Sequence, residues 1–240
     1  MQSSLIIIPT YNEAENISSL FEALFGLHPA LQVLVVDDNS PDGTADLVKA
    51  AMAHYPNRLF ILERQHKAGL GKAYIAGFQW ALRRDYEYIF EMDADFSHDP
   101  QALPDLYAKL QQADMVVGSR YCRGINVVNW PLSRIALSYF ASLYVRLLTG
   151  MPVKDPTAGY VGYRREVLQA IALDEIRFVG YAFQIEMKFK AWQLGKTLVE
   201  HPIIFKNREL GTSKMNGSII WEALFGVLFL RLNALFKKKS

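Results

Sequence analysis

The chain has a single cysteine, Cys122, among its 240 residues and therefore cannot form an internal disulfide. No group of cysteine and histidine residues has the spacing of a zinc site. Such cysteine usage favours a reducing, cytosolic setting, and we expect Cys122 to have no functional role. The formal net charge of only +2 argues against nucleic acid as the main partner, because nucleic-acid-binding domains carry a marked basic excess.

Long uninterrupted hydrophobic runs are also lacking. The N-terminal run from Leu5 to Ile8 is too short for a signal peptide, and no basic region precedes it. The stretch from 219 to 236 is longer, but Glu222, Arg231 and Asn233 interrupt it. A spanning helix needs about 20 apolar residues, and each charge near its centre costs roughly 2.5 to 3.5 kcal/mol on insertion scales. We therefore expect no convincing membrane span in this sequence.

Residues 216–240 are instead expected to form an apolar, amphipathic helix that lies in a membrane interface. Its basic tail, Lys237, Lys238 and Lys239, would face anionic headgroups. Docking of this helix on the core, with a solvated tail, is the alternative. Residues 1–215 contain no linker, and the composition of the whole chain, 51% hydrophobic and 21% charged, is typical of a globular protein. We therefore predict one folded domain over 1–215.

Strand-like runs alternate with helical patterns along the first half of the chain. The candidate strands are Leu5 to Ile8, Val33 to Val36, Leu59 to Leu62, Tyr88 to Met92 and Met115 to Val117. Apolar residues from Ile17 to Leu24 recur at helical spacing, and Asp99 followed by Pro100 is typical of a helix N-cap and first turn. This alternation predicts an α/β fold with an open, mostly parallel sheet flanked by helices.

Acidic and polar residues follow three of the predicted strands. Pro9 to Glu13 follows the first strand, Asp37 and Asp38 close the second, and Asp93 to Asp95 closes the fourth. Ligands of open parallel sheets bind at the carboxyl ends of the strands. In extended chain, residues i and i+2 point to the same side, so the two carboxylates of Asp-Ala-Asp can face one cation. Mg²⁺ or Mn²⁺ bound with the help of substrate phosphates suits such a pair.

Seven motifs occur in one register between Leu5 and Lys214: IIIPTYNEAENI, VVDDNSPDGT, GLGKAYIAGF, MDADFSHDP, GSRY, GYAFQIEM and FKNRELGTSKM. With these motifs the chain resembles the inverting glycosyltransferases of family 2, and within them the polyprenyl (dolichyl) phosphate mannosyltransferases. The resemblance implies a GT-A type, Rossmann-like fold with 1–215 as the catalytic domain.

The resemblance also implies roles for particular residues. The nucleotide pocket is implied to contain Pro9, Tyr11, Glu13, Val36 and Asp38. The metal and the diphosphate are implied to lie among Asp93, Ala94, Asp95 and Ser97. The residues implied to hold donor or acceptor phosphate are Arg120, Arg208 and Lys214, and Arg134 is implied to hold the lipid phosphate. Asp93, Asp95 and Arg120 are the implied catalytic residues.

Some positions depart from the family pattern or have a plainer interpretation. Val161 stands where relatives often carry a basic residue, and Ser97 is a weaker metal contact than the glutamine of some relatives. His66 and His98 are expected to be polar loop residues and not metal ligands. The loop from Arg64 to Gly71 contains glycines before a predicted helix and could contact phosphate through backbone N–H groups. We interpret it as a flexible connector.

The segment from Leu132 to Leu148 is predicted to be a helix with one narrow polar stripe. Its polar residues Arg134, Ser138, Ser142 and Arg146 recur every fourth position, and the remaining arc is apolar. Such a wide apolar face either packs into the core or enters the acyl boundary of a membrane, with Arg134 near the headgroups. The sequence leaves both possibilities open.

The family reaction implied is inverting transfer of mannose from GDP-mannose to a polyprenyl monophosphate, with Mg²⁺ or Mn²⁺, at the cytoplasmic face of a membrane. A phosphate acceptor is already anionic near pH 7 and needs no general base. Two alternatives remain at this point. One is transfer from a UDP-sugar such as UDP-glucose to the same lipid. The other is a non-catalytic nucleotide-sugar-binding subunit that serves a membrane-protein partner.

Overall fold

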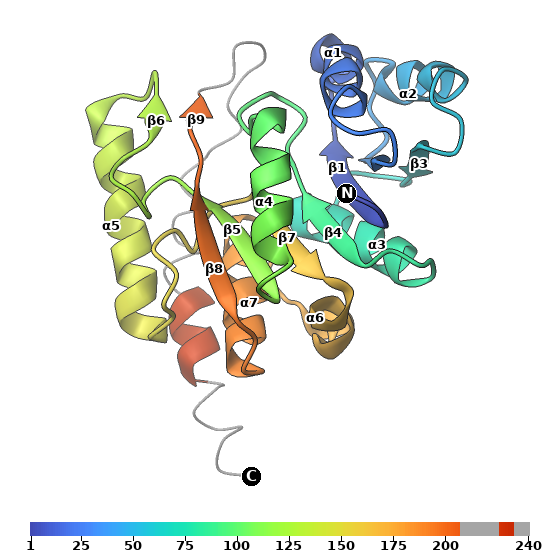
Figure 1. Cartoon of the computed structure of the whole chain (residues 1–240). Helices are drawn as coiled ribbons and strands as arrows, with labels where there is room; N and C mark the ends of the chain where they lie inside the picture. The colour runs from blue at the N-terminus through green and yellow to red at the C-terminus, as the bar shows by residue number, and fades with distance from the viewer. Residues whose placement is uncertain (207–225, 233–240) are drawn as a thin grey trace.

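The computed structural model describes residues 1–206 and 226–232. Its centre is a seven-stranded sheet in the spatial order β3, β2, β1, β4, β7, β5, β8. These strands are β1 (Ser4–Thr10), β2 (Gln32–Asp37), β3 (Leu59–Glu63), β4 (Tyr88–Glu91), β5 (Met115–Ser119), β7 (Val161–Arg164) and β8 (Leu198–Pro202). Neighbouring strands are parallel except at β7, which is antiparallel to β4 and β5. The predicted α/β fold with a mostly parallel sheet is confirmed (Figure 1).

Helices cover both faces of the sheet (Figure 1). They are α1 (Ala14–Phe25), α2 (Thr44–Met52), α3 (Leu70–Leu82), α4 (Leu103–Leu110), α5 (Leu132–Thr149), α6 (Arg165–Ala170) and α7 (Tyr181–Gln193), with 3-10 turns η1 (Pro100–Ala102) and η2 (Leu173–Glu175). One core cluster contains side chains of α3, α6 and α7, and a second contains those of α1, α2 and α4. Leu5 and Ile7 of β1 belong to the first cluster and Ile6 and Ile8 to the second, because side chains alternate along a strand.

The five strands predicted from apolar runs are all present, with slightly shifted ends. The predicted helices that contain Ile17 and Leu132 are confirmed as α1 and α5. Asp99 is the expected N-cap and accepts a hydrogen bond from Gln101 N (2.9 Å). The turn that it caps is the 3-10 turn η1, which leads into α4. Strands β7 and β8 were not predicted, nor was the two-stranded sheet of β6 (Val127–Val128) and β9 (Phe205–Lys206).

Strand β7 separates β4 from β5 in the middle of the sheet. Gly162 lies in register with Phe90 of β4 and Val116 of β5. A Cβ atom at Gly162 would lie 2.6 Å from the Phe90 ring and 2.9 Å from a Val116 methyl group, so glycine lets the three strands pack closely. Val161 is fully buried in the core and in register with Glu91. It therefore contributes to core packing.

The helical segment 226–232 packs beside α5 and α7 (Figure 1). Val227 and Leu230 are buried in one cluster with Val145 of α5 and with Ile185 and Phe189 of α7. This contact agrees with docking of part of the C-terminal region on the core. The rest of 216–240, and the predicted domain boundary at 215, lie outside the described residues. Within the described part of the chain, no helix is long and apolar enough to cross a membrane.

Candidate active site

The carboxyl ends of β1, β2 and β4 meet at one edge of the sheet, as the sequence predicted. Pro9 of β1 lies in register with Val36 of β2, so these two residues of the expected nucleotide pocket are neighbours. Asn12 and Asn39 follow the two strands with φ of +59° and +58°, a left-handed conformation that asparagine adopts more readily than most residues. These turns direct the chain away from the sheet and leave Tyr11 and Asp38 beside its edge.

Asp37 and Asp38 have different environments although they are adjacent. Asp37 is fully buried and accepts hydrogen bonds from Thr10 Oγ1 (2.8 Å), Ser40 N (2.9 Å) and Ser40 Oγ (2.6 Å). It therefore closes the turn after β2. Asp38 forms an ion pair with Arg64 (2.6 Å). Burial raises the pKa of Asp38, and the charge of Arg64 offsets this only in part.

The loop 64–71 folds back onto the expected nucleotide pocket. Besides the Arg64 ion pair, Ala68 N lies 3.4 Å from Asp38 Oδ2, and Lys67 Nζ lies 4.1 Å from the centroid of the Tyr11 ring. The loop was interpreted as a flexible connector, and these contacts place it beside the expected nucleotide pocket. Glu13, the remaining pocket residue, accepts a hydrogen bond from Asn16 Nδ2 (3.1 Å) at the start of α1.

The Asp-Ala-Asp motif forms a tight loop after β4. Asp95 is buried and its Oδ1 accepts a hydrogen bond from Ser97 N (3.1 Å), whereas the Asp93 side chain is 36% exposed. Between them Ala94 is buried, and Phe96 has φ of +57°. A positive φ is unusual for a bulky residue and marks a locally strained backbone.

The donor set of this loop fits a hard divalent cation. Among residues 1–206 and 226–232, no group of three or more His, Cys, Asp or Glu side chains could hold a metal ion. Mg²⁺, however, is usually held by one or two carboxylates together with substrate phosphates and water. The Ser97 hydroxyl oxygen is buried and has no hydrogen-bond partner among the described residues. It supplies an unsatisfied oxygen next to Asp95, consistent with the expected contact.

His98 connects the acidic loop to the rest of the site. It is buried, its ring stacks on Tyr160 (centroids 4.9 Å apart), and its Nδ1 accepts a hydrogen bond from Asp93 N (3.1 Å). Burial lowers the pKa of His98, although the charges of Asp93 and Asp95 oppose this. The side chain is therefore neutral near pH 7. His98 lies in a loop, as expected, and its ring also holds the backbone of the acidic motif.

Arg120, at the end of β5, is held by a buried carboxylate that the sequence analysis did not identify. Asp155 accepts hydrogen bonds from Arg120 Nε (2.7 Å), Nη2 (2.6 Å) and backbone N (2.9 Å). Thr157 Oγ1 accepts another from Nη2 (2.7 Å). Burial alone would raise the pKa of Asp155, but the charge and hydrogen bonds of Arg120 hold it below its usual value. Asp155 is 35 positions away in sequence, and only its Asp-Pro context, which resembles a turn, marks it.

Arg120 and Arg134 meet at the ring of Trp130, a second residue that the sequence analysis missed. The Arg134 Cζ atom lies 4.0 Å from the ring centroid and the Arg120 Cζ atom 5.7 Å from it. Phe205 of β9 contacts the Trp130 ring edge-on (5.4 Å), and its ring also lies 5.6 Å from His98. Aromatic side chains therefore link the acidic loop with the two arginines. Arg208 and Lys214 lie outside the described residues.

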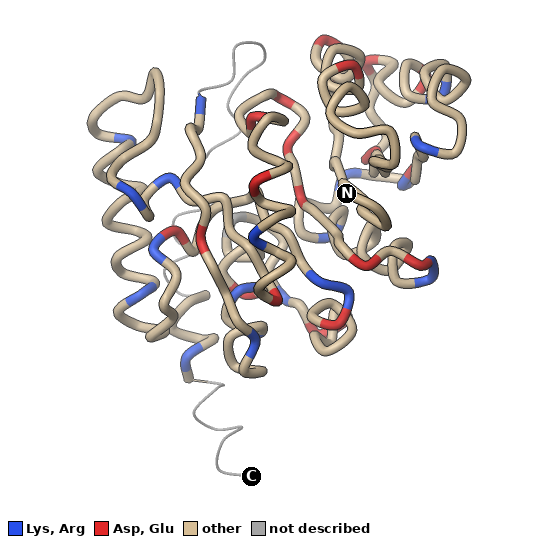
Figure 2. The backbone as a smooth tube through the Cα atoms, viewed as in Figure 1, with Lys and Arg blue, Asp and Glu red and all other residues tan. Residues whose placement is uncertain are grey.

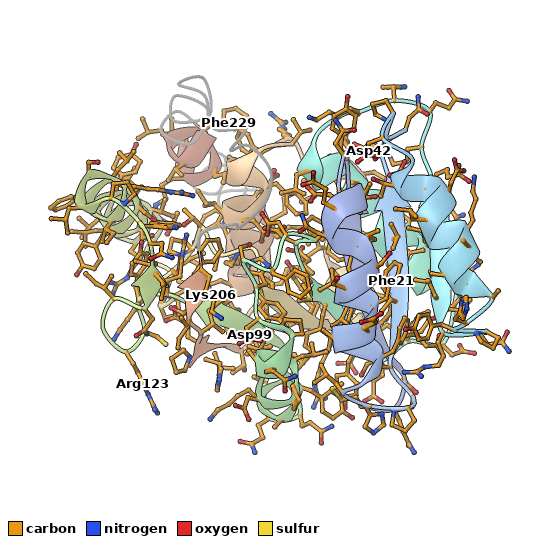
Figure 3. All side chains as sticks on the ribbon, turned by 90° about the horizontal axis from the view of Figure 1, so that it is seen from above. Phe21, Asp42, Asp99, Arg123, Lys206 and Phe229 are labelled. Carbon is orange, nitrogen blue, oxygen red and sulfur yellow. The ribbon has the colours of Figure 1, made fainter. Side chains whose placement is uncertain are left out.

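The site thus has an acidic part at β1, β2 and β4 and a basic part at β5 and α5. In the view from above, Asp42 marks the side of the first part and Arg123 the side of the second (Figure 3). Acidic oxygens at the end of a parallel strand suit a cation that accompanies a nucleotide diphosphate. Arginine side chains that lie on aromatic rings, as these do, are suited to binding a phosphate group. Such an arrangement can bring a sugar nucleotide and a phosphate-bearing acceptor together.

Comparison with known proteins defines the class. The profile of the family "Glycosyl transferase family 2" matches residues 5–172, and the chain therefore belongs to this family. The undecaprenyl-phosphate mannosyltransferase of Micrococcus luteus is 49% identical over 223 residues, which cover 93% of this chain and 91% of that protein. The polyprenol monophosphomannose synthase of Mycolicibacterium smegmatis is 48% identical over 227 residues, which cover 94% and 86%. The resemblance seen in the motifs is confirmed.

Solved structures confirm the fold. Glucosyl-3-phosphoglycerate synthase from Mycobacterium tuberculosis, in complex with Mn²⁺, UDP and glucosyl-3-phosphoglycerate, superposes with a TM-score of 0.67 and 18% identity. The alignment covers 97% of this chain and 80% of that one. The same enzyme in complex with Mg²⁺ and UDP gives 0.67 and 17%, covering 97% and 79%. At this identity the likeness concerns the fold, which is of the GT-A type.

Proposed function

We propose that this chain transfers mannose from GDP-mannose to a polyprenyl monophosphate, with inversion at the anomeric carbon. The two bacterial mannosyltransferases described above, nearly half identical over almost the whole chain, carry this proposal. The acidic loop and the arginine pair at Trp130 support it, because they provide separate places for a nucleotide diphosphate and for a lipid phosphate.

The chemistry requires positioning and electrostatics more than proton transfer. The acceptor phosphate has a second pKa near ~6 and is already a strong anionic nucleophile at pH 7. A cation held by Asp93, Asp95 and Ser97 would neutralise the diphosphate as it leaves. Arg134 would orient the attacking phosphate, since a planar guanidinium can bind two phosphate oxygens at once. Arg120, whose Nε and Nη2 atoms bind Asp155, would add positive charge beside the same phosphate. The indole N–H of Trp130 is buried without a partner among the described residues and is available to the same phosphate.

The nucleotide would lie at the ends of β1 and β2. Pro9, Tyr11, Glu13, Val36 and Asp38 are the pocket residues, and loop 64–71 lies over them through Arg64 and Lys67. Competition with a fluorescent guanine nucleotide tests the base. GDP should displace the probe at least tenfold more effectively than UDP. Equal or better displacement by UDP would favour a UDP-sugar as donor.

We also propose peripheral association with the cytoplasmic face of a membrane, and helix α5 supports the membrane contact. Its polar stripe faces the protein: Ser142 is buried and Ser138 Oγ accepts a hydrogen bond from Tyr121 (2.7 Å). Its exposed face is apolar, with Leu132, Phe140 and Leu147 exposed by 84%, 63% and 76%. The only charges on the helix are basic, and none is acidic (Figure 2). A cluster of exposed large apolar side chains with basic flanks is typical of an interfacial helix.

Flotation with anionic lipid vesicles tests this surface. The double variant Phe140→Ser/Leu147→Ser should lose most of its vesicle binding, because each exposed side chain would bury apolar area in the lipid. Leu47→Ser on α2, which removes another exposed leucine, is the matched control and should bind like the wild type. Unchanged flotation of the double variant would contradict a role for α5 in membrane binding.

A non-catalytic nucleotide-sugar-binding subunit is the second candidate from the sequence. The intact Asp93 and Asp95, together with Arg120 and Arg134, count against it, because binding of a nucleotide sugar alone does not call for a second, basic part of the site beside the cation donors. Binding to a membrane-protein partner is compatible with either candidate and is not required by the first.

A further inference from the structure

Lys188 of α7 is fully buried in the middle of the molecule. Its ammonium group donates hydrogen bonds to Ala158 O (2.7 Å), Gln184 Oε1 (3.0 Å) and Gln184 O (3.1 Å). A lysine ammonium has three N–H donors, so all three have acceptors. A buried lysine is rare and costly unless it is fully paired. Lys188 is not part of the proposed chemistry, and its burial therefore calls for a reason.

Gln184 extends this contact to the strand that carries the metal motif. Its side-chain amide donates a hydrogen bond to Glu91 of β4, whose other carboxylate oxygen accepts one from Tyr163 (3.0 Å). Glu91 is fully buried and lies two residues before Asp93. Burial raises the pKa of Glu91 to about 7 and lowers that of Lys188 to about 8, while their mutual attraction opposes both shifts.

Ala158 extends the same contact to the basic part of the site. It lies in the loop before β7, three residues after Asp155, and its N–H donates to Asp155 O (3.3 Å). The side chain of Asp155 binds Arg120 through three hydrogen bonds. A continuous buried chain of hydrogen bonds therefore runs from Glu91 through Gln184 and Lys188 to the loop that holds Arg120.

The topology explains why such a connection is needed. The metal motif leaves β4 and Arg120 leaves β5, but the antiparallel strand β7 lies between them. Two strand spacings separate the two parts by roughly 10 Å. Attack of a bound phosphate on a bound sugar requires the reacting atoms at about 3 to 3.5 Å. Helix α7 packs on the sheet and reaches both parts at once.

We propose that Lys188 and Gln184 are positioning residues that hold the Arg120 side of the site in register with the Asp93 and Asp95 side. This inference rests on the proposed roles of those three residues. Neither Lys188 nor Gln184 touches the reacting atoms. Their loss should lower kcat for transfer to polyprenyl phosphate, while binding of GDP, which involves only the β1, β2 and β4 side, should persist.

Three variants separate positioning from mere stability. Lys188→Met removes the donors but leaves Glu91 buried without its cation, so stability and kcat should both fall. Glu91→Gln/Lys188→Met removes both charges, and stability should largely return because no unpaired buried charge remains. Gln184→Met interrupts the chain and keeps both charges. We expect each folded variant to lose about 10- to 100-fold in kcat, with GDP affinity within twofold of wild type.

Three quantities are measured for each variant: kcat with GDP-mannose and polyprenyl phosphate, GDP affinity by probe displacement, and the thermal midpoint. Lys109→Met, which changes an exposed lysine on α4, is the control and should keep wild-type values. Recovery of kcat together with stability in the double variant would overturn the proposal. Failure of all three variants to fold would also overturn it, in favour of a structural role. A wild-type chain without any transfer would instead refute the proposed function itself.

Discussion

Asp95 is the side chain on which the proposed chemistry depends most directly. It is buried, and its carboxylate is oriented by Ser97 N at the end of the central strand β4. Asp95→Asn keeps the size and the hydrogen-bond acceptor but removes the charge that a cation needs. We expect transfer to fall below detection while the thermal midpoint stays within a few degrees of wild type. Near-normal turnover with an unchanged response to Mg²⁺ or Mn²⁺ would contradict the assignment.

Asp155 gives a prediction of stability against pH. The pKa of Asp155 in the folded protein is lower than its ordinary value of 3.8. Its ion pair therefore stabilises the fold above about pH 4, and this stabilisation is lost as the pH falls through the folded-state value. Asp155→Asn leaves Arg120 buried without its charge partner, which should cost about 3 to 5 kcal/mol at pH 7.

Urea unfolding of the wild type and of Asp155→Asn at several pH values checks the predicted pH dependence of stability. The difference in unfolding free energy should be constant from pH 5 to pH 8 and should shrink below pH 4. A difference that changes between pH 5 and pH 8 would mean that Asp155 does not titrate as a paired, depressed carboxylate.

The residues of the site differed in how far the sequence could identify them. Asp93, Ala94 and Asp95 follow a clear apolar strand in a recognisable motif, and they form one loop. Asp155 and Trp130 carry no comparable local signal. Their importance comes from contacts with Arg120 across the chain, which only tertiary packing creates.

Among the elements, the predicted strands share a simple property: each is a run of buried apolar residues. Strand β7 is short and contains Gly162, and β8 is only partly buried along its length. Neither gives a strong periodic signal, because glycine has no side chain and an edge strand is not uniformly apolar. Strands β6 and β9 have two residues each, too few for any pattern.

Helix α5 shows how a correct pattern can leave its meaning open. The sequence predicted the helix and its polar stripe, but either side could have faced the core. In the structure the polar stripe faces inward: Ser138 and Ser142 lie against the protein, and Val145 packs with α7. The direction of a helix face depends on its neighbours, which a single sequence does not specify.

Gly162 offers a test of how the three central strands pack. Gly162→Ala would place a methyl group 2.6 Å from the Phe90 ring. We expect a loss of about 1 to 3 kcal/mol in unfolding free energy, because a packed core accepts added volume only by strain. Val128→Ala, on the exposed strand β6, should change it by less than about 0.5 kcal/mol. Equal effects of the two substitutions in urea unfolding would contradict close packing at β7.

At the scale of the whole molecule, the sheet places two kinds of chemistry next to each other. Parallel strands β1, β2 and β4 bring acidic and nucleotide-binding residues to one edge, and β5 with α5 brings the arginines. Of the residues expected to carry the chemistry, the acidic motif, Arg120 and Arg134 lie within the described part of the chain. The fold class followed from the alternation of strands and helices, whereas the distance between the two parts of the site depends on β7 and α7.

The most direct test of the central claim is the release of GDP from GDP-mannose by the purified chain, measured with and without polyprenyl phosphate in detergent and with Mg²⁺, Mn²⁺ or EDTA. We predict release of GDP and formation of a mannosyl lipid that both require the acceptor and the metal, and that EDTA abolishes. Turnover with a UDP-sugar and none with GDP-mannose would contradict the assigned donor. Absence of turnover with every sugar nucleotide would contradict the assignment of the chain as a polyprenyl phosphate mannosyltransferase.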